Sequence, residues 1–162
     1  MAAAIRVIGI DPGLVKTGYG IVEFIGQSFS VIADGVIRVE TKLQLADRLF
    51  CIYNDVNDII KKYAPECGAI EETYVNSGAI SSLKLAQARA SAILAAKQNG
   101  LDITAYQAKT IKKTICGNGN ADKVQVAAML SYLMPSNNIQ SKGYDNTDAI
   151  AIAICHILHV RK

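Results

Sequence analysis

The sequence of 162 residues has no tryptophan, only three prolines and only four cysteines, and the spacing of the cysteines argues against two kinds of functional site. The cysteines are Cys51, Cys67, Cys116 and Cys155. Their spacing forms no C-x-x-C pair, which argues against a zinc knuckle and a redox dithiol, so we expect buried thiols of a reducing compartment. No apolar run approaches the ~20 residues of a membrane helix, and the N-terminus lacks the cationic start of a signal peptide. These absences predict a soluble, cytoplasmic protein that makes no use of a membrane.

Apolar residues make up 51% of the chain and charged residues 19%, which supports a packed core and argues against intrinsic disorder. No linker, repeat or low-complexity tract divides the sequence, and its length suits one domain. We therefore expect a single domain over residues 1–162.

The net charge of +3 is too small to mark a nucleic-acid binder, but the charges are unevenly distributed. Between Thr73 and Tyr144 the only acids are Asp102 and Asp122. The basic residues of the same stretch are Lys84, Arg89, Lys97, Lys109, Lys112, Lys113, Lys123 and Lys142. A basic surface beside acids supplied from elsewhere suits an enzyme that processes a polyanion, whereas a solvated helix face is the alternative for any one lysine.

Apolar periodicity predicts an α/β fold with a mixed sheet flanked by helices. The expected strands are 5–10, 17–24, 29–39, 67–70 and 101–106. The expected helices are 43–63, 81–98, 121–134 and a final segment around 149–154. That final segment alternates with period two, as a strand would, but its alanines and the capping residues before it favour a helix. The first three strands, joined by short turns, predict an antiparallel meander.

Acidic residues fall where expected strands end and where the last helix begins. Asp11 ends the first strand, while Glu71 and Glu72 both follow the fourth. Asp145 and Asp148, three residues apart, would share one face of a helix. Singly, these acids have ordinary explanations as a turn former, a solvent-facing glutamate, a helix cap and a first-turn acid.

Together, these carboxylates can converge on one edge of the sheet, where their repulsion is costly unless a cation offsets it. An all-oxygen site favours Mg²⁺ or Mn²⁺, and two such ions can hydrolyse a phosphodiester. The sequence has no Gly-x-Ser-x-Gly motif. His156 and His159 stand beside Cys155 with a spacing that permits a metal site, but ordinary places at the end of a helix are favoured.

Five motifs occur in an order that points to a known family. They are Gly9-Ile10-Asp11-Pro12-Gly13 with Thr17-Gly18-Tyr19-Gly20, Ala69-Ile70-Glu71, the segment 82–89, the segment 117–126, and Asp145-Asn146-Thr147-Asp148-Ala149. The set resembles the bacterial crossover-junction endodeoxyribonuclease family, the RuvC Holliday junction resolvases.

The resemblance implies an RNase H-like fold and a homodimer that makes paired, metal-dependent nicks in opposing strands of four-way DNA junctions during recombination and repair. It also implies that Asp11, Glu71, Asp145 and Asp148 are catalytic and hold two Mg²⁺ ions, for which Mn²⁺ can substitute. A second acid, Glu72, leaves two candidate glutamates, of which the motif match favours Glu71. A branch-migration motor of the RuvA-RuvB type is the implied partner.

The resemblance also implies DNA contacts. Lys112 and Lys123 match basic residues near the DNA backbone, and Lys84 and Arg89 of the matched helix are further candidates. Tyr74 stands where the family usually has phenylalanine near the junction centre, and a tyrosine there can stack on an unpaired base. The loop 76–78 lacks a lysine that the family often carries. The helix over 81–96 is a candidate dimer face, although core packing is the simpler explanation for most of its residues.

Two other readings share parts of this pattern. Sugar-kinase and actin-like ATPases also open with a strand, an Asp and a glycine-rich hairpin, but they need two such domains, and Lys16-Thr17 lacks the Walker A register. A binding-only nuclease fold predicts loss of carboxylates, all of which are present here. A related RNase H-like nuclease that acts on RNA or RNA–DNA hybrids would carry the same acids, and it stays open as the alternative.

Overall fold

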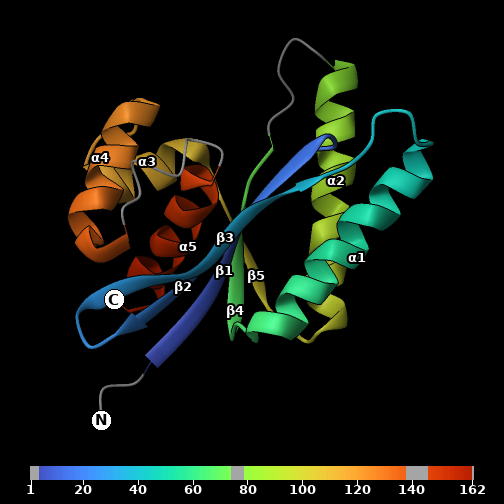
Figure 1. The fold of residues 1–162 in the computed structure, drawn as a ribbon. Helices are drawn as coiled ribbons and strands as arrows, with labels where there is room; N and C mark the ends of the chain where they lie inside the picture. The colour runs from blue at the N-terminus through green and yellow to red at the C-terminus, as the bar shows by residue number, and fades with distance from the viewer. Residues whose placement is uncertain (1–3, 74–78, 138–145, 162) are drawn as a thin grey trace.

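The structure is a computed structural model that describes residues 4–73, 79–137 and 146–161. Its centre is one sheet with the strand order β3-β2-β1-β4-β5 (Figure 1). The strands are β1 (Ala4–Asp11), β2 (Lys16–Ile25), β3 (Ser28–Arg38), β4 (Cys67–Glu71) and β5 (Ile103–Tyr106). The first three form an antiparallel meander, β4 runs parallel to β1, and β5 runs parallel to β4. The mixed five-stranded sheet predicted from the sequence is confirmed.

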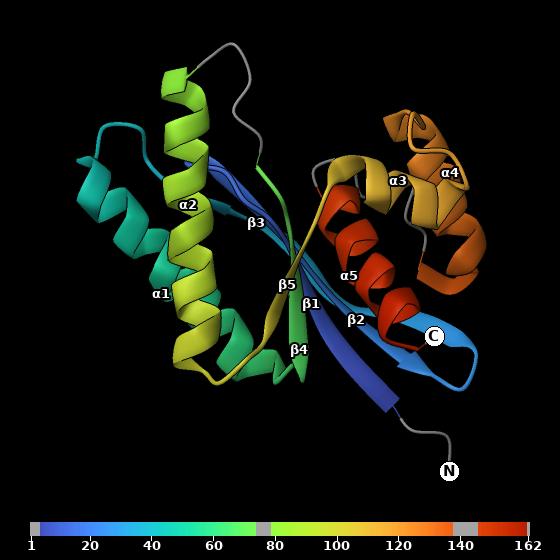
Figure 2. The same ribbon diagram turned by 180° about the vertical axis from the view of Figure 1, so that it is seen from behind.

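Helices cover both faces of the sheet (Figures 1 and 2). They are α1 (Leu45–Tyr63), α2 (Ala79–Gln98), α3 (Ala108–Cys116), α4 (Lys123–Leu133), a 3-10 turn η1 (Pro135–Asn137) and α5 (Thr147–Val160). The α1–α2 pair lies on one face, whereas α5 lies on the other with α3 and α4 packed beside it. The expected helices are present, but α3 is missing from the prediction. Only Ile111 and Ile115 of this short helix are buried, so its apolar signal is a single i, i+4 pair.

The alternation of side chains along β1 assigns each residue to one of two cores. Ile8 and Ile10 pack with α1 and α2, whereas Val7 packs with α5 on the opposite face. Because side chains alternate along a strand, Gly9 and Asp11 face α5 as Val7 does. The acidic end of β1 therefore lies on the α5 face of the sheet.

Two glycines allow α5 to lie unusually close to that face. Gly9 and Gly20 are paired across β1 and β2. A Cβ atom on Gly9 would overlap the carbonyl oxygen of Ala149, and one on Gly20 would stand 3.0 Å from the backbone nitrogen of Ile150. Any side chain at these positions would push the first turns of α5 away from the sheet.

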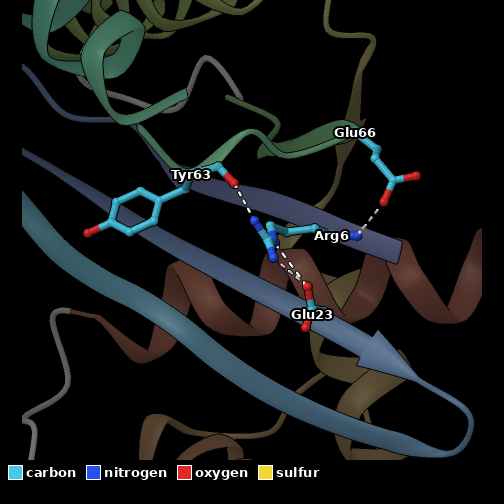
Figure 3. A network of polar contacts seen from close by, with 4 residues as sticks. All are labelled: Arg6, Glu23, Tyr63 and Glu66. Carbon is cyan, nitrogen blue, oxygen red and sulfur yellow. Dashed lines mark hydrogen bonds and ion pairs between the residues drawn. The ribbon is translucent and has the colours of Figure 1, made fainter. Parts of the chain in front are cut away.

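The start of β1 is held by a network of polar contacts (Figure 3). The Arg6 guanidinium donates from Nη2 to Oε1 of Glu23 at 2.6 Å and from Nη1 to the carbonyl of Tyr63 at 2.7 Å. The Arg6 backbone N–H donates to Oε1 of Glu66 at 3.0 Å. This network joins β1, β2 and the end of α1 at the end of the sheet opposite to Asp11.

Two further predictions from the sequence concern membrane-spanning helices and the burial of the cysteines. No helix in the described parts of the chain is long and apolar enough to cross a membrane. All four cysteines are free thiols, but Cys155 alone is buried, and the other three are half-buried. The expectation of four buried thiols is therefore wrong for Cys51, Cys67 and Cys116, which lie at the margins of the two cores.

Candidate active site

Two carboxylates meet at the ends of neighbouring parallel strands. Asp11 is the last residue of β1 and Glu71 the last of β4. The register pairs Ile10 with Ile70, so the next residue along each strand places the two acids side by side. Glu71 shares its face with Ala69, which packs in the core beneath α5. Strand alternation thus puts both acids on one face.

The start of α5 brings a third carboxylate to the same place. Asp148 lies in the first turn of α5, immediately before the residues that contact Gly9 and Gly20. The Asn146 side chain at the N-cap donates from Nδ2 to Oδ2 of Asp34 on β3 at 2.7 Å. Close helix–sheet packing and this hydrogen bond together set where Asp148 stands.

One cavity of about 250 Å³ joins these acids to two lysines. Its lining residues are Asp11, Glu71, Ala108, Ile111, Lys112, Lys123, Val126, Asp148, Ala151 and Ile152. The lysines come from α3 and α4, which pack outside α5. The five charged residues are therefore collected from β1, β4, α3, α4 and α5, although they are far apart in sequence.

Local capping sets the position of Lys123. Asp122 and Gln125 form a capping box, in which Oδ1 of Asp122 accepts from the backbone N–H of Gln125 at 2.8 Å and Oε1 of Gln125 accepts from that of Asp122 at 2.9 Å. Lys123 is consequently the first helical residue of α4, and its Nζ lies 3.3 Å from Oδ2 of Asp148.

Burial and repulsion between acids, in that order, perturb the ionisation of Glu71 in the cavity. The pKa of Glu71 is raised to about 7, first by burial and then by the neighbouring charges of Asp11 and Asp148, against the lowering effect of Lys112 and Lys123. Two lysines do not compensate these carboxylates fully. The cavity can therefore gain stability from an added cation.

Glu71 and Glu72, at the end of β4, lie in different surroundings. Glu71 lines the cavity, whereas Glu72 is not among the lining residues. The Glu72 backbone N–H instead donates to the carbonyl of Tyr106 on β5 at 2.8 Å. The motif match that favours Glu71 agrees with this geometry.

The remaining residues singled out by the sequence lie in different surroundings. Arg89 is on α2, across the sheet from the cavity, where its Nε donates to the backbone carbonyl of Glu71 at 3.2 Å. This contact holds the end of β4 from the α2 face of the sheet. No pattern in the sequence predicted it. Lys84 is exposed on the same helix. Tyr74, Asp145 and the loop 76–78 lie outside the described residues.

The histidines make contacts within the fold. Nδ1 of His156 lies 2.9 Å from the Tyr106 hydroxyl, and Nδ1 of His159 lies 2.8 Å from the carbonyl of Cys155. Burial lowers the pKa of His156, which favours its neutral form. Across the described ranges, no three His, Cys, Asp or Glu side chains stand close enough together to hold an ion by themselves.

The sheet order and the flanking helices are those of an RNase H-like fold, and the acids at the ends of β1 and β4 lie together in one cavity, as the predicted nuclease site requires. The family model described as crossover junction endodeoxyribonuclease RuvC matches residues 7–156. The chain belongs to this family, as its five motifs predicted.

Relatives and a solved structure agree with this assignment. A crossover junction endodeoxyribonuclease RuvC from Maricaulis maris is 43% identical over 161 residues, covering 99% of this chain and 95% of its own length. One from Allorhizobium ampelinum is 42% identical over 156 residues, covering 96% and 91%. The structure of T. thermophilus RuvC in complex with a Holliday junction substrate superimposes with a TM-score of 0.89 at 26% identity, covering 97% of this chain and 95% of that one.

Proposed function

We propose that this protein resolves four-way DNA junctions by nicking two opposing strands, as an endodeoxyribonuclease of recombination and repair. The observation that carries the proposal is the single cavity in which Asp11, Glu71 and Asp148 meet Lys112 and Lys123, in a chain that belongs to the RuvC family. The T. thermophilus relative of the same fold is described in complex with a Holliday junction substrate, which supports this choice of DNA.

The donor set of the cavity fits a hard divalent cation. Its acidic residues offer only oxygen atoms, and the charges of Asp11 and Asp148 add to burial in raising the pKa of Glu71, which a bound cation would oppose. We assign Asp11, Glu71, Asp148 and, by its motif, Asp145 as the residues that would hold two Mg²⁺ ions, or Mn²⁺ in their place. When bound, the ions would neutralise phosphate charge and make water more acidic.

The protein's own residues would do the positioning. Asp11 and Glu71 are held on strand ends, whose packed backbone keeps the geometry of the carboxylates constant between free and bound states. Lys123 stands beside Asp148, at the place where a phosphate would meet the acids, and Lys112 faces the same cavity from α3. Both lysines would hold DNA through backbone phosphates, which orients the strand without reading its bases.

The outward stripe of α2 suits a homodimer. The core side of this helix is formed by Ala88, Ser91, Ala92, Ala95 and Ala96. Leu83, Ala86, Ala90 and Leu94 recur at three- and four-residue steps on the exposed side, and the two leucines are 62% and 63% exposed. A second copy would bury this apolar stripe and supply the second active site that paired nicks in a two-fold junction require.

Further contacts follow from the same assignment. Tyr74 would stack near the junction centre, and Lys84 would contact phosphates farther from the nick. A branch-migration motor of the RuvA-RuvB type would deliver the junction, in the cytoplasm, where bacterial DNA is processed.

A nicking assay with matched substrates tests the proposal. We expect the purified protein with Mg²⁺ to cut a four-way DNA junction in two opposing strands, and to leave linear duplex of the same sequence intact. Preferential cutting of an RNA–DNA hybrid would overturn the proposal in favour of the alternative nuclease. Cutting of a single strand by a monomer would refute the dimer.

A further inference from the structure

The cavity with the carboxylates continues over the β2–β3 hairpin. A second cavity of about 100 Å³ is lined by Asp11, Lys16, Gly18, Val36, Lys123 and Asp148. It shares Asp11, Lys123 and Asp148 with the larger cavity but adds residues of β2 and β3 in place of those of α3. The acids consequently have a basic residue on each side, Lys112 toward α3 and Lys16 toward the hairpin.

Strand register explains why Lys16 points to this place. Asp11 is paired with Gly18, and Gly18 with Val36, which forms one row across three strands. Two rows beyond the end of β1, Lys16 is paired with Arg38. Residues two apart on a strand, and residues directly opposite in an antiparallel pair, share a face of the sheet. Lys16 and Arg38 therefore extend the face that carries Asp11.

No side chain rises from the sheet between Asp11 and Lys16 on this row of the cavity, because the residue between them on β2 is a glycine. Gly18 has no side chain, so the sheet backbone itself forms the bottom of the cavity there. Lys16 lines the cavity, Arg38 lies opposite it on β3, and both residues are exposed to solvent. A DNA strand that enters past Lys112 and crosses the carboxylates has to leave over this row, where an adjacent phosphate would meet an ammonium and a guanidinium.

We propose that Lys16, with Arg38 beside it, binds the phosphate on the side of the scissile phosphodiester opposite to the phosphate held by Lys112. This inference rests on the proposed nuclease function. Lys123, which lines both cavities and lies 3.3 Å from Asp148, would stand between the two, at the scissile phosphate itself. Cations on both flanks would hold the strand across a site whose acids repel it.

Single-turnover nicking of junctions with methylphosphonates at individual positions tests the arrangement. In the wild type, removing the phosphate charge on either side of the nick should slow cutting. Lys16→Ala should slow cutting of the normal junction about tenfold and should lose its sensitivity to methylphosphonates on one side only. Lys112→Ala should lose it on the other side. Loss at the same positions in both variants, or unchanged nicking by Lys16→Ala, would overturn the inference.

The salt dependence of junction binding separates this inference from the nuclease proposal. The double variant Lys16→Ala/Arg38→Ala should lower the slope of log affinity against log salt by about two. Lys61→Ala removes an equally exposed charge from the last turn of α1, on the other face of the sheet, and should leave the slope unchanged. If the wild type binds but nicks no junction, the proposed function fails while the slope still decides the phosphate contacts. A double variant with the wild-type slope refutes those contacts whatever the nicking result.

Discussion

At the start of β1 the Arg6 guanidinium meets the Glu23 carboxylate at 2.6 Å and the carbonyl of Tyr63 at 2.7 Å (Figure 3). At the other end of the same strand, Asp11 stands beside Glu71, in a cavity that also holds Asp148. The first group pairs opposite charges, whereas the second collects like charges, which together with the larger effect of burial raise the pKa of Glu71 to about 7.

This difference shows which polar groups serve the fold and which are kept for a ligand. A paired, hydrogen-bonded charge at the edge of a core contributes to stability, because its partners replace the water that it loses. A half-buried cluster of carboxylates has the opposite effect unless a cation offsets its charge, and sites that need such clusters lose stability for function. Variants at the two ends should therefore affect different measurements.

The largest effect should come from neutralising the four carboxylates assigned to the active site. Asp11→Asn, Glu71→Gln, Asp145→Asn and Asp148→Asn should each lower the single-turnover nicking rate by about a thousandfold or more. Junction affinity in a gel-shift assay should persist, because the amides are nearly isosteric and remove only negative charge. Glu72→Gln is the control and should nick normally. Loss of activity in that control, with Glu71→Gln active, would show that the wrong glutamate has been assigned.

A change beneath α5 should affect both stability and activity. Gly9→Ala would press a methyl group against the carbonyl of Ala149, so α5 must move and take Asp148 with it. We expect a loss of about 3 kcal/mol in the free energy of unfolding, measured by urea denaturation, with slower nicking by the folded fraction. Ile8→Val, on the α1–α2 face of the same strand, should cost about 1 kcal/mol and leave nicking unchanged. Equal activity in the two variants would contradict the role of this close packing.

At the start of β1 the expected effect is on stability alone. Arg6→Ala would leave the Glu23 carboxylate, whose side chain is 19% exposed, without the partner that it has at 2.6 Å. Urea denaturation should show a loss of about 2 kcal/mol, whereas the nicking rate of the folded protein should equal that of the wild type. A reduced nicking rate at full folding would mean that the two ends of the strand are coupled.

Arg89 reaches the acidic end of the sheet from the opposite face, so its effect should fall on rate rather than on DNA binding. Arg89→Ala removes the donor to the Glu71 carbonyl and should slow nicking about tenfold without changing the salt slope of binding. Arg89→Lys, which keeps a donor, should recover part of the rate. Lys84→Ala on the same helix should instead reduce the slope by about one. A reduced slope for Arg89→Ala would show that the residue contacts DNA, as the resemblance implies.

The smallest effect should be a pH-dependent gain in stability. The Glu71 pKa is about 7 in the folded protein and near 4.5 when unperturbed, so the folded state binds the proton more tightly. Wild-type stability from this group is therefore greatest below pH 4.5, falls between pH 4.5 and 7, and reaches its lowest level above pH 7. Glu71→Gln should raise the melting temperature by about 3 °C at pH 8 and should match the wild type near pH 4.

Added Mg²⁺ should change the difference in melting temperature between the wild type and Glu71→Gln. A cation that binds only the folded protein should raise the melting temperature of the wild type at pH 8 more than that of Glu71→Gln, and EDTA should reverse the gain. An equal melting temperature for the two proteins at every pH would contradict the raised pKa.

Much of the sheet could be predicted because strand signals are local. The meander, β4 and β5 each have a short apolar run with a turn signal beside it, and residue parity along β1 already separates Ile8 and Ile10 from Asp11. The short helix α3 could not be predicted, since two buried isoleucines in nine residues give too weak a periodic signal. The partial exposure of three cysteines was equally invisible, because it depends on which elements happen to cover them.

The sequence by itself predicted the carboxylate set and its chemistry, because acids at the ends of apolar strands, followed by the motif around Asp148, are typical of oxygen ligands for a cation. Only the tertiary structure decided which residues surround them. The parallel register of β1 with β4 places Glu71 beside Asp11 in the cavity, where Glu72 is absent from the lining, and the contact of α5 with Gly9 sets the place of Asp148. The support from Arg89 and the basic row that begins at Lys16 arise from packing between segments distant in the chain. Such contacts depend on the positions of whole elements, which no local pattern records.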